Sequence, residues 1–261
     1  MRKYINYLLT FKNFYYLFTI LVKRDIKKKY KGSILGILWS LINPLLNMII
    51  LAIVFSTLFK NNIQNFPVYL LTGRLLFSFF ESATSSSMKS IINSASLLKK
   101  VYVPKYIMTF AGVTANFINF LISMIALVLV IIATDAKITW NILYSPVYLL
   151  LFFIFVSGIS FILSTITVFF RDITHIYQVF VHLLVYASAI FYPVDIIPDK
   201  FRFILTLNPL YHFISGFRQS VYYGLPPEFN NLMICSVLAL LSMIIGIIVF
   251  KNKQDKFILH I

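Results

Sequence analysis

Cysteine occurs once in the 261-residue sequence, at Cys235, so no disulfide can form within the chain. Charged residues are also scarce: Asp, Glu, Lys and Arg make up 12% of the chain, about half of their usual share in soluble domains. Hydrophobic residues make up 60%. This composition excludes a soluble globular domain and indicates an integral membrane protein.

Motifs for catalysis and nucleotide binding are absent from the sequence. It contains no G-x-x-x-x-G-K-[ST] phosphate-binding loop, no H-E-x-x-H metal site and no G-x-S-x-G nucleophile, and its His and Cys residues do not occur at metal-ligand spacing. We therefore expect no catalytic residue, no metal and no cofactor on this chain. Any transport driven by ATP would need a separate protein to bind the nucleotide.

Long uncharged intervals define the expected architecture. Five of them exceed the ~20 residues that cross the hydrocarbon core of a bilayer, and a sixth apolar stretch is interrupted by Arg74 and Glu81. We predict an all-α integral membrane protein with six transmembrane helices in a single domain, residues 1–261. The expected spans are 34–59, 68–92, 106–133, 144–170, 173–192 and 230–250.

Acidic residues are few, and the basic residues are distributed unevenly along the chain. Seventeen of the 23 Lys and Arg residues precede the first span, follow the last one, or lie in the second and fourth loops between spans. Five lie in the alternate loops, and Arg74 lies within a span. Because basic loops stay inside the cell, both termini of this multi-pass protein are expected in the cytoplasm, at the plasma membrane. The cations favour membrane lipids, not nucleic acid, as partners.

Three segments outside the spans are expected to form short helices. Residues 12–31 carry apolar residues at helical spacing between lysines, which predicts an N-terminal amphipathic helix in the membrane interface; a cytoplasmic extension of the first span is the alternative. Residues 95–104 form a cytoplasmic loop with one apolar helical face. The outer segment 193–227 contains two apolar pieces that are too short to span, and we interpret them as interfacial or re-entrant helices.

Ionisable residues inside a span are candidates for function because lipid disfavours charge. Arg74 and Glu81 are seven residues apart and share a helix face with Ser78. Each has a structural alternative: Arg74 could extend to the outer interface, and Glu81 could be hydrogen-bonded inside the bundle. His175 and His182 fit either a proton relay or helix packing. Spans two and five are rich in aromatic residues, which suit sugar rings. The expected translocation path, a route between subunits, is lined by Phe77, Ser78, Phe80, Glu81, Tyr177, Tyr186, Phe191 and Tyr192.

Four motifs occur in a fixed order along the chain. They are RDIKKKYKGSILGILW from Arg24, SLLKKVYVPK from Ser96, FFRDI from Phe169 and LNPLYHFISGFRQ from Leu207. Together they resemble the permeases of ABC polysaccharide and teichoic-acid exporters, and the resemblance covers nearly the whole chain. One departure is Ser188-Ala189, where that family commonly has Ser-Pro, so a kink that depends on this proline is not expected here.

The resemblance implies a homodimer of six-span subunits and two copies of a separate ATPase, which would carry the ATP and Mg. The complex would move a lipid-linked polymer such as teichoic acid, O-antigen or capsule-like polysaccharide outward, and this chain would be a transport permease and not an enzyme. Two more residue sets follow. The ATPase-coupling helix in residues 95–104 would present Leu97, Leu98, Lys99, Lys100, Val101, Tyr102 and Pro104. The inner gate for the lipid carrier would consist of Arg24, Asp25, Lys27, Lys28, Tyr30, Ser33 and Trp39.

Two other functional classes are compatible with the composition. A membrane-embedded transferase acting on lipid-linked sugars would share the aromatic residues and the basic inner face, but it needs a catalytic carboxylate or His in a loop. A channel or a structural assembly partner would need no ATPase. Co-purification of an ATPase separates transport from both. The sequence is compatible with several exported polymers and does not distinguish among them.

Overall fold

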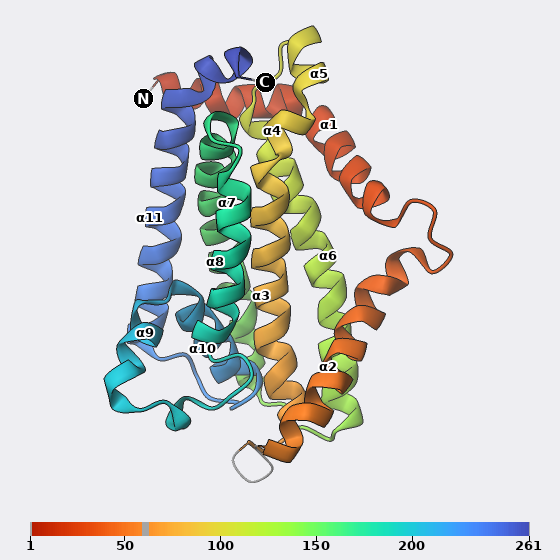
Figure 1. The fold of residues 1–261 in the computed structure, drawn as a ribbon, viewed down its shortest axis with the longest axis vertical. Coiled ribbons are helices and arrows are strands. Elements are labelled where there is room, and N and C mark those ends of the chain that lie inside the picture. Colours follow the sequence, from red (N-terminus) through yellow and green to blue (C-terminus); the bar gives the residue numbers. More distant parts are fainter. Residues whose placement is uncertain (1, 59–62, 261) are drawn as a thin grey trace.

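The computed structural model describes residues 2–58 and 63–260, and all regular structure in these residues is helical. Long helices run along the long axis of the molecule, and both termini lie at the same end (Figure 1). We call this the termini end. The four longest helices of the bundle are α3 (Phe66–Met88), α6 (Tyr106–Ala133), α7 (Ser145–Phe169) and α11 (Phe229–Lys253).

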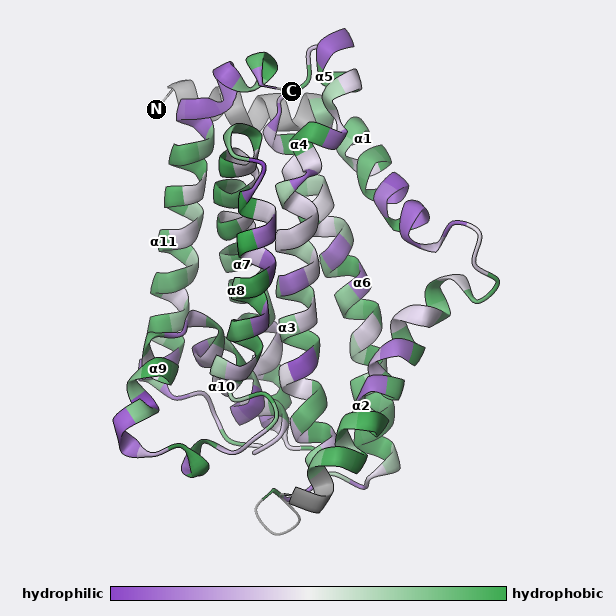
Figure 2. Ribbon diagram, in the orientation of Figure 1, coloured by the Kyte–Doolittle hydropathy of each residue, from purple (hydrophilic) through white to green (hydrophobic). Residues whose placement is uncertain are grey.

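Four helical stretches of the described chain are long and apolar enough to cross a membrane (Figure 2). The other two expected spans differ from these. Helix α3 carries Arg74 and Glu81, and α8 (Ile173–Ala187) has 15 residues, about 22 Å at 1.5 Å per residue, against a hydrocarbon thickness of about 30 Å. The four apolar stretches are Gly36–Phe55, Tyr106–Ala133, Trp140–Phe169 and Phe229–Leu259.

The termini end is covered by α1 (Arg2–Tyr30), which lies across the bundle (Figure 1). The apolar face predicted for this segment is present, but it packs on protein: Leu21 and Val22 are buried, and Phe18 stacks on Phe110 of α6 with 5.6 Å between ring centroids. Three short helices lie at the same end, namely α4 (Ser90–Asn93), α5 (Ala95–Lys100) and η5 (Gln254–Leu259).

The opposite end is closed by short helices. Asn208 begins the largest of them by accepting a hydrogen bond from the backbone N–H of Leu210 at 3.0 Å, which satisfies a donor that the first turn leaves free. This helix, α10, packs on α3, α7 and α11. The helices at this end are η2 (Trp140–Tyr144), η3 (Val194–Ile196), η4 (Asp199–Phe201), α9 (Arg202–Leu207) and α10 (Pro209–Val221).

The interior of the bundle is built largely from phenylalanine rings. Phe79 of α3 contacts Phe120 of α6 and Phe152 of α7, and Phe152 in turn contacts Phe213 of α10, with ring centroids 5.1–5.8 Å apart. Offset and edge contacts at these distances add about 0.5–1.5 kcal/mol per pair beyond area burial. Much of the aromatic content therefore holds the helices together.

Helix α8 ends five residues before the predicted bound of 192. The chain then turns through Ser188, Ala189 and Ile190, all fully buried, and Ala189 has a left-handed φ of +49°. This conformation is uncommon for a residue with a Cβ and needs support from its surroundings. Proline, whose ring fixes φ near −65°, would not fit this turn.

Candidate functional site

A polar groove runs between α1 and α2 (Trp39–Leu58) on one side and α3, α4 and α6 on the other. It consists of two adjoining clefts of about 530 Å³ and 110 Å³, which share Lys29, Asn116 and Asn119. The serines of α3 enter it at four-residue steps, which a helix places on one face. The polar lining residues are Arg24, Asp25, Lys28, Lys29, Asn43, Asn47, Arg74, Ser78, Ser82, Ser86, Ser90, Asn93, Ser94, Asn116, Asn119 and Ser123.

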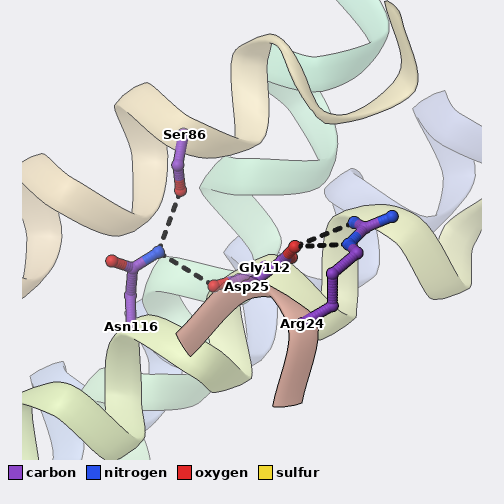
Figure 3. A network of polar contacts seen from close by, with 5 residues as sticks. All are labelled: Arg24, Asp25, Ser86, Gly112 and Asn116. Atoms are coloured by element: carbon purple, nitrogen blue, oxygen red, sulfur yellow. Dashed lines mark hydrogen bonds and ion pairs between the residues drawn. The ribbon is translucent and has the colours of Figure 1, made fainter. Parts of the chain in front are cut away.

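The larger cleft lies at the termini end and is rimmed by cations. Arg24 donates to Asp25 Oδ1 from Nε at 2.9 Å and from Nη2 at 2.8 Å (Figure 3). This pair neutralises itself, so Lys28 and Lys29 give the rim its net positive charge. Asn116 donates from Nδ2 to Ser86 Oγ and to the carbonyl of Gly112, both at 2.9 Å.

Two hydrogen bonds hold the ends of α1 and α2 against α6. Tyr30 Oη donates to Asn119 Oδ1 at 3.0 Å, and Ser123 Oγ donates to the carbonyl of Ser40 at 2.8 Å. The turn between the two helices uses Gly32 at φ +80°, which a side chain would disfavour. These contacts hold the end of α1 and the start of α2 against α6 beside the groove.

The residues predicted for the inner gate have different roles. Of the seven, Arg24, Asp25 and Lys28 line the polar cleft. Lys27 and Tyr30 lie in an adjacent apolar cleft of about 480 Å³ that the start of α2 also lines. Ser33 Oγ accepts the N–H of Gly36 at 3.1 Å and so stabilises the turn, and Trp39 begins α2 outside all three clefts.

Arg74 lines the far cleft, with its guanidinium carbon 5.9 Å from the ring centroid of Phe77. Among the described residues, which include all eight acids, the ion pairs within 4 Å are Arg24–Asp25 and Arg202–Asp199. Arg74 therefore has no carboxylate partner. Glu81 does not line the groove and lies on the side of α3 near Tyr177.

The structure separates the residues predicted to line a path. Ser78 lines the groove, but Phe77 and Phe80 are buried in the core, and Phe80 stacks on Phe155 of α7 at 6.3 Å. Tyr177 Oη donates to Thr84 Oγ1 at 2.6 Å and ties α8 to α3. The remaining members lie around the end of α8: Phe191 is buried, Tyr192 is half-buried and Tyr186 is 65% exposed.

The loop predicted to couple to an ATPase projects from the termini end (Figure 1). Its helix, α5, ends at Lys100 because Val101 has extended backbone, so the predicted face of Leu97, Leu98, Val101 and Tyr102 is not continuous. Leu98 is buried against the bundle, whereas Tyr102 is 88% exposed. Lys99 and Lys100 are exposed, Leu97 is half-buried and Pro104 follows the extended segment.

Residues 16–222 match the family model described as ABC-2 type transporter. The match covers more than half of the chain and includes all helices that line the groove. The chain belongs to the ABC-2 type transporter family. This membership confirms the resemblance to ABC permeases that the four ordered motifs indicated.

Several curated relatives match this ABC-2 transporter over almost its whole length. The O-antigen export system permease protein RfbA of Klebsiella pneumoniae is 31% identical, with 94% of this chain and 96% of the relative covered. RfbA of Myxococcus xanthus is 28% identical, with 91% and 92% covered. The polysialic acid transport protein KpsM of Escherichia coli is 23% identical, with 89% and 91% covered.

One residue of this ABC-2 transporter was missed by sequence reasoning, which counted Arg218 as an outer-loop cation. Arg218 is 4% exposed in α10, and its guanidinium donates to the carbonyls of Tyr69, Ala189 and Ile190 at 2.8–3.1 Å. It also stacks on the Tyr69 ring at 3.6 Å. Burial lowers the pKa of Arg218, yet a guanidinium stays charged in proteins. Its place in the LNPLYHFISGFRQ motif was the one available signal.

Proposed function

We propose that this chain is the membrane-spanning subunit of an ATP-driven exporter that moves a lipid-linked cell-surface polymer outward across the plasma membrane. The observation that carries the proposal is the match of the chain, over about nine-tenths of its length, to proteins named O-antigen export permeases and a polysialic acid transport protein. These names favour a polysaccharide over teichoic acid as the polymer. They also favour transport over the transferase alternative.

The arrangement of the termini supports six crossings with both ends in the cytoplasm. Helix α3 runs from the far end, where α2 ends, to α4 at the termini end, and α8 leads from the end of α7 back toward α9 (Figure 1). With these two helices the four apolar stretches become six crossings. The basic segments at residues 89–105 and 251–256 lie at the termini end, and α1 begins there before it descends along the side of the bundle (Figure 2). The positive-inside rule then makes the termini end cytoplasmic.

The surface of α8 supports a homodimer. This helix buries Tyr177 and Val181 against the bundle and leaves most of its remaining side chains exposed. The exposed set mixes polar and apolar residues, which suits neither lipid nor water alone. A second copy of the chain would cover it and enclose a path between subunits. The exposed residues are His175, Ile176, Gln178, Val179, Phe180, His182, Leu183 and Tyr186.

Affinity purification and export measurements test the proposed function together. The tagged chain, isolated from its own host in mild detergent, should bring down an ATPase with a G-x-x-x-x-G-K-[ST] loop. Depleting the chain should stop surface display while lipid-linked polymer accumulates inside the cell. Replacing the loop lysine of that ATPase with Ala is the matched control and should cause the same accumulation. If depletion instead abolishes the polymer inside as well, the chain acts in synthesis and the proposal is wrong.

A further inference from the structure

The groove between α1, α2, α3 and α6 carries cations along its length. Lys28 lines the cleft at the termini end, Arg74 lines the far cleft and Lys29 lines both, while the other polar side chains are mostly hydroxyls and amides. The one acid in its lining, Asp25, is paired with Arg24. Such a lining provides hydrogen-bond donors throughout and repels no anion.

Arg74 is the unexplained charge of this groove. A cation inside a membrane span normally pairs with an acid or with backbone carbonyls, because an unpaired one is costly. Arg74 does neither within the described residues; its guanidinium lies over the face of Phe77. The cleft also places it beside Ser78 and Ser82. A bound anion is the missing partner that this environment accommodates.

We infer that the groove is a binding track for the phosphate or pyrophosphate headgroup of a lipid-linked substrate, with Arg74 as its far anion site. The inference rests on the proposed function, because it names the part of the lipid-linked polymer that the groove takes. Arginine suits this role since its planar fork donates two hydrogen bonds to phosphate oxygens at once. The occupant is the headgroup of the transported lipid and not a bulk phospholipid.

The dimensions and surroundings of the groove fit a lipid headgroup that enters from the termini end. Ser86 and Arg74 are twelve residues apart on α3, about 18 Å along the helix axis, which is more than half of the hydrocarbon thickness. The apolar cleft around Tyr30 and Leu38 adjoins the entrance and would take the attached hydrocarbon chain. Polar and apolar compartments side by side match the two parts of one amphiphile.

Protection of a cysteine placed next to Arg74 tests the inference. The reporter is Ser78→Cys in a Cys235→Ser background, in nanodiscs of zwitterionic phosphatidylcholine. The rate of its alkylation would be measured with and without farnesyl pyrophosphate as the probe. The probe should slow alkylation when position 74 is Arg or Lys. In Arg74→Gln its apparent affinity should be about tenfold lower, because one charge-assisted hydrogen-bonded contact is lost. Arg171→Gln, which removes an exposed cation outside the groove, is the matched control and should match the parent.

The inference would be overturned if the probe protected Arg74→Gln as well as the parent, or if it protected neither at any concentration. It would also be overturned if phosphatidylglycerol alone protected the parent as well as the probe does, because Arg74 would then be a site for bulk anionic lipid. Inorganic pyrophosphate should protect only weakly if the hydrocarbon chain contributes. Polymer export measured in parallel separates the two proposals. Export that continues in Arg74→Gln contradicts this inference alone, whereas a wild-type complex that exports nothing contradicts the proposed function.

Discussion

Two arginines of this chain lie within the helical part of the molecule, one buried and one in the polar groove, and the structure treats them differently. Arg218 donates to three backbone carbonyls, and its Nε lies 3.4 Å from Thr72 Oγ1, so its hydrogen-bonding capacity is nearly used up. Arg74 has an aromatic face and an open cleft. The first arginine is therefore a structural clamp between α10, α3 and the turn after α8, and the second is available to a ligand.

Removing the Arg218 guanidinium should destabilise the chain strongly. Arg218→Gln leaves buried carbonyls without donors, and each such group costs about 1–3 kcal/mol. We expect a loss of about 3 kcal/mol or more, measured as a lower melting temperature in detergent. Arg202→Gln is the control, since Arg202 pairs with a largely exposed Asp199 and such pairs contribute about 0–1 kcal/mol. Equal melting temperatures for the two variants would show that Arg218 is not a clamp.

At the scale of elements, close helix packing depends on glycine in one place above all. A Cβ on Gly158 of α7 would lie 2.3 Å from the backbone carbon of Ser242 in α11, and a Cβ on Gly246 would lie 2.4 Å from the carbonyl oxygen of Gly158. Side chains cannot be accommodated at these distances. The small residues let the two backbones touch. Close contact of this kind is the usual basis of helix association in a membrane, because lipid is as apolar as the helices and hydrophobic burial does not drive them together.

The exposed segment after α5 is the element that we expect to contact the ATPase. Tyr102→Asp, which places a charge on an 88%-exposed aromatic ring, should reduce ATPase co-purification without changing the melting temperature of the chain. Leu98→Asp is the contrasting variant, because Leu98 is buried in the bundle and its replacement should lower the melting temperature. If Tyr102→Asp retains the full amount of ATPase and supports normal export, the docking surface lies elsewhere.

Helix positions were predictable from the sequence wherever length and apolarity decide them, as in α6 and α7, because a bilayer constrains both. The ends of α8 and α5 were not. The end of α8 depends on a left-handed Ala189 whose carbonyl is held by Arg218, a contact between residues 29 positions apart. The end of α5 depends on Val101, which takes extended backbone.

The residue types of the site were predictable from the sequence, but the direction in which each side chain points was not. Aromatic enrichment in α3 and α8 was visible in the sequence. It did not distinguish Phe77 of α3, which fills the core, from Tyr186 of α8, which is exposed. The polar face was a better guide, because serines at four-residue steps lie on one side of a helix whatever the helix packs against. Asn116 and Asn119 joined them only through the packing of α6 on α3.

For the molecule as a whole, the distribution of charge and the position of the termini lead to the same orientation. The exposed residues Lys137 and Asp199 lie at the end opposite the termini, and Ser96 lies in exposed α5 at the termini end. Asn61, which the sequence also places in an outer loop, falls outside the described residues. Because the long helices run between them, the two ends of the bundle face opposite sides of the membrane.

Single cysteines in a Cys235→Ser chain should report this orientation in intact cells. Lys137→Cys and Asp199→Cys should react with a membrane-impermeant maleimide added outside, because their side chains are exposed at the outer end. Ser96→Cys should react only after the cells are opened, although its side chain is equally exposed. The opened-cell sample is the control for intrinsic reactivity. Labelling of Ser96→Cys in sealed cells would show that the chain has the opposite orientation, with the positive rim of the groove outside. That orientation would remove the basis for outward export.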